Sequence, residues 1–534
     1  MATLGQLKRS SIHIQHAVKE VQEKINHRHI LTFMLTIGFA IGGIVEQSSS
    51  VALLPNNKAL VSAEEFAQYV ENTSYITRLC NPPENDSNPD VHVVLSIPHI
   101  EIPLSLSEET ESILREAFMW GCFISPLGAS RIAVRVGAEQ LFGYAILGVG
   151  ISAALVPAAW LTSAHVALRI FQGICIGATW PTAHMMAASW IDPKYMGTFV
   201  SCYTAVNLGY AIVGYLGTFL VTNFGRDSVC YFICLTVFLW FFFWWRFVEV
   251  SLAFKTPNEK VRSAIPWRHF LASPAVWACG LVVLGSQWAD ATLMLGVLKY
   301  LKLVYGFTTS HNDVLSAVPH IGHFFAAITF GVIVDHIRAS GIVSTTTARK
   351  LLVYIAHFLP AALIFVLGYT GCDPAAPAAM YTAALTLTAA TPAGAYASAI
   401  DLAPEYAGTT FGLCTTLGAA GLLAANYVVR EGLHGSFAGW WRLVFGIASA
   451  ELFLTACVFL TIGKGCALSW SSHYVPKQLP PEQPRFSIVT VRSSDTVGAR
   501  TNSLDSDDVL CARRGSHNVN HLQETLDNSK RINI

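Results

Sequence analysis

The sequence predicts an all-α integral membrane protein with about twelve transmembrane helices arranged in two lobes of six. Of its 534 residues, 53% are hydrophobic and only 13% are charged, whereas soluble globular domains carry about 25% charged residues. The mean hydropathy is +0.46. Apolar stretches close to the roughly 20 residues that a membrane-spanning helix needs recur along most of the chain. The net charge is zero, which argues against nucleic acid as a partner.

Twelve apolar stretches are each long enough to cross a bilayer as a helix. In chain order they span residues 30–54, 113–134, 139–159, 164–187, 198–222, 228–248, 274–304, 312–334, 349–369, 376–400, 407–428 and 441–462. The first is longer than the apolar core of a signal peptide and lacks a small-residue cleavage site, so we expect it to be retained. A polar stretch separates the sixth from the seventh, which is the layout of a two-lobed transporter.

This layout divides the chain into consecutive parts. They are an N-terminal arm (1–29), a first six-helix lobe (30–248) with an outer loop (55–111), a linker (249–273), a second six-helix lobe (274–462) and a C-terminal tail (463–534). Lys and Arg are more frequent in the arm, the linker and the loops of the same parity than in the opposite loops, which predicts that both termini are cytoplasmic. The tail has too little apolar surface to pack and is expected to be disordered.

The loop 55–111 has the features of a segment that passes through a secretory lumen. Asn72 and Asn85 each begin an Asn-x-Ser/Thr sequon, so both are predicted glycosylation sites. Cys80 in this loop and Cys372 in another outer loop either form a disulfide between the lobes or remain two free thiols. The plasma membrane and an endolysosomal or vesicle membrane both stay open. No metal-ligand spacing occurs, and we expect neither a metal nor a cofactor.

Charged and polar residues within the spans mark candidate functional positions, because an intramembrane charge is costly unless it faces a cavity or a partner. Glu46 and Gln47 lie deep in the first span, and Asp290 lies two residues after Trp288 in the seventh. For Glu46 the alternative is a carboxylate hydrated at an aqueous mouth. For Asp290 the alternative is contact with a lysine near the outer end of the same helix.

Several spans share an order of residues with one family of transporters. The segments are ALRIFQG (167–173) running on to WPTAH (180–184) and Trp190, SPAVWA (273–278) with Trp288, LSAVP (315–319), GCDP (371–374), and DLAPEYAG (401–408) continuing through Gly412 to TLG (416–418). Together they resemble the anion:cation symporters of the major facilitator superfamily, over roughly residues 28–470. The resemblance implies the major facilitator fold.

The resemblance also implies alternating access, in which two lobes rock about a central cavity that binds the solute near mid-membrane. Members carry organic anions or phosphate, coupled to protons, sodium or the membrane potential. Glu46 stands where relatives have a substrate-facing arginine, whereas Arg169 is retained and the two acidic positions after it are Gln172 and Ile176. Two accounts stay open. Either Glu46 pairs with Arg169, or Glu46 titrates and supplies the coupling.

Other polar residues have either a cavity role or a structural one. His184 matches a family histidine and is expected in or near the cavity, or in helix packing. Asn207 can face either a neighbouring helix or the cavity. A structural role is expected for His320, His323, His357, Asp401, Glu405 and Glu451.

The cytoplasmic gating motif of the superfamily is kept unevenly between the lobes. In the first lobe Arg135 is present, but Val134 occupies the preceding acidic position; in the second lobe Asp335 and Arg338 keep a version of the motif. Charges at such a helix end stabilise one closed state. Small residues are expected to let helices approach closely at Gly173, Gly177, Ala205 and Gly209.

Three functions follow from these observations. The first is a secondary active transporter of a small organic solute, an organic anion by resemblance, with H⁺ or Na⁺ as the coupling ion. The second is a transporter of the same fold for a cationic or zwitterionic solute, suggested by Glu46 and Asp290. The third is a membrane sensor that does not transport. An enzyme is not expected, because the sequence holds no nucleophile and base constellation, zinc motif or Walker loop.

Overall fold

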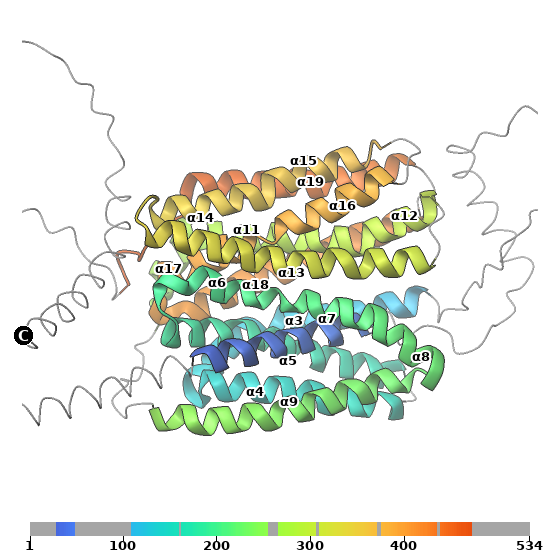
Figure 1. Ribbon diagram of the computed structural model, residues 1–534, viewed down its shortest axis with the longest axis horizontal. Helices are drawn as coiled ribbons and strands as arrows, with labels where there is room; N and C mark the ends of the chain where they lie inside the picture. The colour runs from blue at the N-terminus through green and yellow to red at the C-terminus, as the bar shows by residue number, and fades with distance from the viewer. Residues whose placement is uncertain are drawn as a thin grey trace, which may run out of the picture.

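The computed structural model describes residues 28–48, 108–159, 162–254, 265–305, 309–370, 375–434 and 438–471. Apart from short turns, these ranges are helical and contain no strand. The helices run side by side along the long axis of the molecule (Figure 1). Those of the N-terminal half, coloured blue to green, lie on one side, and those of the C-terminal half, coloured yellow to red, lie on the other.

The first lobe holds six membrane-spanning segments. The first four are the helix Arg28–Ser48, α3 (Glu108–Val136), α4 (Ala138–Leu155) continued by η1 (Val156–Ala158), and α5 (Thr162–Trp190). The fifth segment follows η2 (Pro193–Tyr195) and consists of α6 (Met196–Ser201), η3 (Cys202–Ala205), α7 (Val206–Ile212), η4 (Val213–Gly217) and α8 (Thr218–Phe224). The sixth is α9 (Asp227–Phe254).

The second lobe follows a short helix, α10 (Trp267–Leu271). Its first three segments are α11 (Pro274–Ala291), η5 (Thr292–Val297) and α12 (Leu298–Tyr305); α13 (Thr309–Ala339); and α14 (Thr345–Val353), η6 (Tyr354–Phe358) and α15 (Leu359–Leu367). Its last three are α16 (Ala375–Thr388), η7 (Pro392–Tyr396) and α17 (Ala397–Leu402); η8 (Pro404–Tyr406) and α18 (Ala407–His434); and α19 (Ala438–Ile462).

Each of the twelve predicted spans corresponds to a helical segment. Among the described residues, 10 of these segments are long and apolar enough to cross a membrane. The other two are α5, which carries polar residues such as Arg169 and Gln172, and the segment from α16 to α17, which a turn at 389–390 divides. Polar side chains and a broken helix are features of solute-binding segments in transporters.

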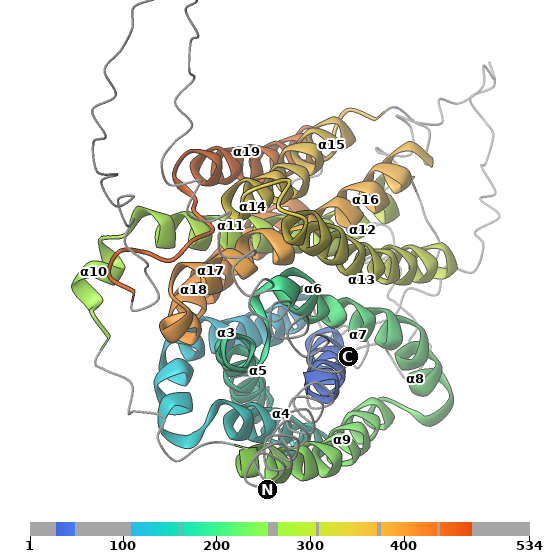
Figure 2. The same cartoon turned by 60° about the vertical axis from the view of Figure 1, so that its left-hand side comes forward.

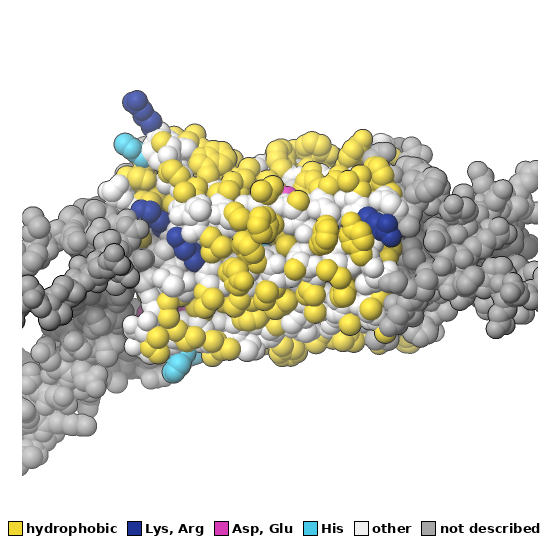
Figure 3. Space-filling view, turned by 90° about the horizontal axis from the view of Figure 1, so that it is seen from above, with side chains coloured by type: hydrophobic (Ala, Val, Ile, Leu, Met, Phe, Trp, Pro, Cys, Tyr) yellow, Lys and Arg dark blue, Asp and Glu magenta, His cyan; other side chains and the backbone are white. Residues whose placement is uncertain are grey.

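The lateral surface of the bundle is the surface that a lipid-embedded protein requires. In Figure 3 hydrophobic side chains cover most of one face, and the Lys and Arg side chains lie near its two ends. Large apolar residues on the described surface include Phe242, 63% exposed, and Phe325, 62% exposed. Apolar groups in contact with lipid chains need no burial within the protein, and cations near the helix ends reach the polar headgroups.

Close helix contacts hold the first lobe together, as the small residues predicted. A Cβ atom at Gly173 of α5 would lie 2.0 Å from the backbone oxygen of Phe118 on α3. At Gly209 of α7 a Cβ would lie 2.1 Å from the backbone oxygen of Ala40. Only glycine allows the backbones to come this near, and such contacts are a main source of helix association in membranes. The prediction of close approach is therefore confirmed at both positions.

Some predictions concern residues outside the described ranges. They are the sequons at Asn72 and Asn85, the thiols of Cys80 and Cys372, and the arm. The tail differs from the prediction at its start, because residues 463–471 pack on the second lobe. The Leu468 amide donates to the backbone oxygen of Leu402 at 2.9 Å, and the Ser471 hydroxyl donates to Glu405 at 3.0 Å. Leu468 and Trp470 pack against the hydrophobic core. The overall polar composition of the tail did not indicate these local apolar contacts.

Candidate functional site

A cavity lies between the two lobes. Its empty volume is about 1270 Å³, which includes solvent space at its open side. The first lobe contributes wall residues from its first helix, α3, α5, η3 and α7, and the second lobe contributes them from α11, α13, α16, η7 and α18. Figure 2 shows the lobes facing each other, with α13 beside α6 and α7, and α18 beside α3.

The two ends of the bundle differ, and we name them by their connections. The linker end is where α9 ends and α11 begins; the loop end is where the first helix reaches Ser48 and α3 begins. Aromatic rings of both lobes form a layer across the cavity. Phe39 stacks on Tyr203 with centroids 4.6 Å apart, and Tyr396 contacts Phe411 at 4.9 Å. Trp180 contacts Phe39 at 4.9 Å and joins the two pairs.

Among the described residues, the cavity wall holds two carboxylic acids and no lysine or arginine. They are Glu46 on the first helix and Asp290 on α11. The Tyr210 hydroxyl donates a hydrogen bond to Glu46 Oε2 at 2.7 Å. Asp290 Oδ1 is buried and has no hydrogen-bond partner among the described residues. A buried carboxylate oxygen without a donor is costly, which makes Asp290 a candidate ligand for a cationic group or a proton.

A polar contact joins the lobes beside Glu46. Asn207 lines the cavity from α7, and its Oδ1 lies 2.7 Å from Nδ1 of His320 on α13. The ring of His320 meets Tyr210 edge to face at 5.4 Å. Glu46, Tyr210, Asn207 and His320 therefore form one cluster that spans both lobes. His323 also lines the cavity, and its Nδ1 lies 2.7 Å from the backbone oxygen of Leu385.

The ion pair between Glu46 and Arg169 that the sequence left open is absent from the described contacts of Arg169. Its guanidinium donates to the backbone oxygen of Val45 at 3.2 Å, to Gln172 Oε1 at 3.1 Å and to Ser48 Oγ at 3.4 Å. All three partners lie in the first lobe. Arg169 and Gln172 are buried there, at 4% and 2% exposure, and do not line the cavity. The reason is geometric: Arg169 faces the carboxyl end of the first helix rather than the space between the lobes.

Three other candidate residues also lie outside the cavity wall. His184 is fully buried, stacks on Phe411 with centroids 3.4 Å apart, and its Nε2 lies 3.2 Å from the backbone oxygen of Tyr396. His184, which belongs to the first lobe, therefore contacts two residues of the second lobe behind the aromatic layer. Trp288 packs against the core of the second lobe, and Gln47 is half-buried.

Sequence reasoning missed several uncharged residues of the wall. Gln287 and Ser286 precede Trp288 on α11, and Tyr210 lies one turn after Asn207 on α7. A helical period of 3.6 places Ser286 and Asp290 on one face of α11, so that spacing was the available signal. Further polar wall residues come from η3, α5, α16, α18 and the residue before η7: Thr179, Thr204, Thr388, Thr391 and Thr415.

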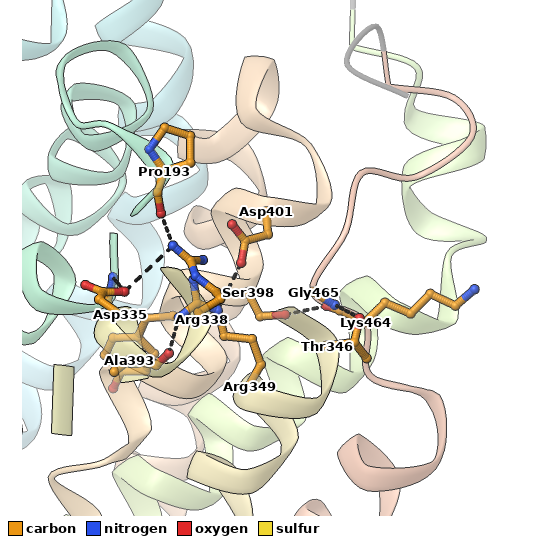
Figure 4. Close-up of polar contacts among 12 residues, drawn as sticks. Pro193, Asp335, Arg338, Thr346, Arg349, Ala393, Ser398, Asp401, Lys464 and Gly465 are labelled. Atoms are coloured by element: carbon orange, nitrogen blue, oxygen red, sulfur yellow. Dashed lines mark hydrogen bonds and ion pairs between the residues drawn. The ribbon is translucent and has the colours of Figure 1, made fainter. Parts of the chain in front are cut away.

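The two predicted gating residues of the second lobe join the lobes at the linker end (Figure 4). Asp335 Oδ1 accepts from the Gly197 amide at 3.0 Å, and its Oδ2 accepts from the Thr198 amide at 2.7 Å and hydroxyl at 2.8 Å. The carboxylate thus caps the start of α6. Arg338 Nη2 lies 3.7 Å from Asp335 Oδ1 and donates a hydrogen bond to the backbone oxygen of Pro193. These contacts join the two lobes at the linker end.

Near the linker end, each lobe also has polar contacts within itself, and these contacts differ between the two lobes. Arg349 Nε donates to Asp401 at 3.0 Å, and its Nη1 donates to the backbone oxygen of Ala393 at 2.6 Å (Figure 4). In the first lobe Arg135 is exposed at the end of α3. The buried carboxylate there is Glu139, which accepts from the indole of Trp190 at 3.0 Å.

An ion pair joins the lobes near the loop end. Arg430 Nη1 on α18 lies 2.6 Å from Glu116 Oε1 on α3, and Asn426 donates to the same oxygen at 3.4 Å. Both charged side chains are partly exposed, at 34% and 27%. Polar contacts between the lobes therefore occur near both ends of the cavity, with the buried set at the linker end and the more exposed set near the loop end.

A bundle of twelve spans in two lobes around a polar cavity defines a multi-pass membrane transporter. A family model described as Major Facilitator Superfamily matches residues 93–426. The chain belongs to the major facilitator superfamily, whose members are transporters and not enzymes. The solved structure of a proton:xylose symporter, XylE, has the same fold with a TM-score of 0.57 at 14% identity, covering 82% of this chain and 97% of that one.

Curated relatives are more similar in sequence. Sialin of Ovis aries is 28% identical over 381 residues, which cover 68% of this chain and 77% of sialin. Vesicular glutamate transporter 2 of Bos taurus is 27% identical over 406 residues, covering 71% of this chain and 68% of the relative. The resemblance seen in the sequence is thus confirmed.

Proposed function

We propose that this chain transports a small organic anion across a membrane by secondary active transport. The observation that carries the proposal is the polar cavity enclosed between two lobes of a major facilitator fold, in a chain related to sialin and to vesicular glutamate transporters. The lobes would rock about this cavity, breaking the contacts of Asp335 when the linker end opens. We further propose that both termini are cytoplasmic, that the coupling ion is H⁺ or Na⁺, and that the membrane is the plasma membrane or that of an endolysosomal compartment or vesicle.

The acidic wall sets a condition on anion binding. Two like charges about 4 Å apart repel by roughly 4 kcal/mol at an effective dielectric constant near 20. An anion would meet this repulsion beside ionised Glu46 and Asp290, whereas protonated carboxyl groups would donate hydrogen bonds to it. Anion binding is therefore linked to proton uptake at the wall. This favours H⁺ over Na⁺ as the coupling ion for an anionic solute.

A second candidate is a cationic or zwitterionic solute, and one observation favours it. The two acidic wall residues, including the unpartnered Asp290 Oδ1, would bind an amine without any proton uptake. An amino acid with two carboxylates and one amine would satisfy both candidates, because its amine could bind Asp290 while its carboxylates bind protonated or hydroxyl groups. The same fold and the same cavity serve either solute.

Flux into liposomes containing the purified full chain tests the proposal. We expect uptake of anionic solutes that an inward proton gradient accelerates, and anion binding that strengthens as the pH falls. A cationic solute predicts the opposite pH dependence, because protons compete with it for the carboxylates. Solute binding without any flux, under proton, sodium and electrical gradients alike, would instead identify a sensor.

A further inference from the structure

A buried chain of polar side chains leads from the cavity wall into the second lobe. Ser286 on α11 and Thr391 line the cavity, with their hydroxyl oxygens 3.4 Å apart. Behind them His357 of η6 is 0% exposed, and its Nε2 lies 3.0 Å from Ser286 Oγ. On the far side, His357 Nδ1 lies 3.3 Å from Thr455 Oγ1 of α19. The chain thus joins four membrane-spanning segments.

The hydrogen bonds of Thr455 assign a proton to one nitrogen of the histidine. The Thr455 hydroxyl donates to the backbone oxygens of Glu451 at 2.9 Å and Leu452 at 3.1 Å, so it accepts from His357. Nδ1 of His357 therefore carries a proton, whereas the single hydroxyl proton of Ser286 has two acceptors within reach, His357 Nε2 at 3.0 Å and Thr391 Oγ1 at 3.4 Å. A proton that arrives from the cavity would add to Nε2. Ser286 would then accept from Nε2–H and turn its own hydroxyl toward Thr391, which is within reach.

A carboxylate lies beside this chain. Glu451 Oε2 on α19 is buried and has no hydrogen-bond partner among the described residues. A Cβ atom at Gly285 would lie 2.6 Å from that oxygen and 2.5 Å from Thr455 Oγ1, so the glycine makes the room that both groups occupy. An intramembrane carboxylate is costly unless a counter-charge is near. An imidazolium at His357 would supply that charge.

Other titratable groups lie on the neighbouring elements, among them the thiols of Cys279 on α11 and Cys457 on α19. Arg349 on α14 is paired with Asp401. Asp290 lies one turn after Ser286 on α11 and faces the cavity. The Tyr381 hydroxyl on α16 is buried without a described partner. His357 and Glu451 are therefore two titratable groups beside one polar chain and separate from the acidic wall, and Asp290 lies one turn from Ser286 on the same face of α11.

We propose that His357 and Glu451 form a proton-binding site in the second lobe that couples solute movement to a proton gradient. The inference rests on the proposed transport function and adds the location of its coupling site. The chain Thr391, Ser286, His357 and Thr455 supplies a hydrogen-bonded route between the cavity and the pair.

Two measurements on the same liposomes separate the inference from the function on which it rests. Counterflow, the exchange of labelled for unlabelled solute without any gradient, reports the transport cycle. Uptake driven by an imposed proton gradient reports coupling. For His357→Gln and Glu451→Gln we expect counterflow within about twofold of the wild type and loss of at least tenfold in gradient-driven uptake. Ser449→Ala on α19 is the matched control, because Ser449 donates to the Ala361 backbone oxygen at 2.7 Å and carries no titratable group.

A direct proton measurement completes the test. When solute is added to detergent-solubilised protein in weak buffer, the number of protons bound to the protein should change. His357→Gln should reduce that change. Gly285→Ala crowds Glu451 and Thr455 without removing a titratable group, and should weaken coupling to a lesser degree. Gradient-driven uptake and proton exchange unchanged in both His357→Gln and Glu451→Gln would overturn the inference. Absent counterflow in the wild type would instead reject the transport function.

Discussion

At the residue scale, the most informative property of this protein is the sign of the charged side chains that line the cavity. The resemblance suggested a cationic site for an anion, yet the described wall holds two carboxylic acids and no lysine or arginine, and Arg169 is bound within the first lobe. Glu46 and Asp290 were identified from the sequence because ionisable residues are rare in apolar stretches. The direction of Arg169 was not, because the sequence places it on a helix and the tertiary structure decides which neighbour it meets.

The first prediction concerns Asp290. Replacing it by Asn should weaken binding of an amine-bearing solute about ten- to a hundredfold, because a charge-assisted hydrogen bond contributes about 1.5–3 kcal/mol. Binding of a purely anionic solute should stay equal or become tighter. Isothermal titration with both solute types measures this difference, and exposed Asp227→Asn serves as the control. Unchanged amine affinity in Asp290→Asn would exclude the carboxylate from the binding site.

The second prediction concerns the hydrogen bond between Tyr210 and Glu46, 2.7 Å long. Tyr210→Phe and Glu46→Gln should each weaken solute affinity, and the double variant should lose less than the sum. Residues in direct contact show coupling of about 0.5–3 kcal/mol in such cycles. Thr415→Ala, on the α18 wall, should add independently to either change. A fully additive cycle for Tyr210 and Glu46 would show that their contact does not contribute to binding.

At the scale of elements, α5 illustrates how packing and polarity compete within one helix. Its Gly173 faces α3 so closely that a Cβ would lie 2.0 Å from a backbone oxygen and 3.0 Å from the Cα of Gly121. Arg169 and Gln172 interrupt the apolar run, so α5 does not qualify as a span by hydropathy. The helix remains in the bundle because its polar groups find partners inside the lobe.

The third prediction follows from that contact. Gly173→Ala should lower the melting temperature of the detergent-solubilised protein by several degrees, because a backbone clash forces α3 and α5 apart and overpacking costs about 1–3 kcal/mol. Gly446→Ala on α19 is the control, since a Cβ at Gly446 meets nothing within 4 Å. Equal melting temperatures for the two variants would show that α3 and α5 can separate without cost.

π-helical turns are a second feature of the elements. They occur at η4 and η5, at η6 with His357, and at η7 with Tyr396. Such turns are rare and are often found at functional sites. Three of them hold residues of the polar chain or the cavity wall, namely Met294 in η5, His357 in η6 and Tyr396 in η7. Hydrophobic periodicity does not register one extra residue in a turn, so these distortions could not be read from the sequence.

At the scale of the whole molecule, two sets of contacts between the lobes set which end of the cavity closes. At the linker end the buried Asp335 accepts three hydrogen bonds from α6. Near the loop end, Glu116 and Arg430 form a partly exposed ion pair. Hydrogen bonds to a buried charge are worth more than an exposed ion pair, which typically contributes less than about 1 kcal/mol. The structure is therefore held most firmly at the linker end.

The fourth prediction uses this asymmetry. Asp335→Ala should increase the fraction of molecules open at the linker end about tenfold or more. Glu116→Gln should instead increase the fraction open at the loop end, by less than about fivefold. Alkylation of the cavity residue Cys122, mapped by mass spectrometry in sealed vesicles with a membrane-impermeant maleimide on either side, reports the open end. Asp227→Asn removes an exposed carboxylate at the start of α9 and should change the alkylation rate from neither side. Shifts in the same direction for Asp335→Ala and Glu116→Gln would contradict opposing closures.

The sequence by itself determined the membrane class, the twelve spans and their division into two lobes, because these depend on lengths and apolar composition that every bilayer helix must satisfy. It also identified Glu46, Asp290 and Asp335 as charges needing an explanation. Only the tertiary structure decided that Arg169 faces the first helix, that His184 lies behind the aromatic layer, and that His357 joins Ser286 to Thr455. Each of those contacts spans separate helices, and the rotation of one helix against another is set by packing between surfaces far apart in the chain.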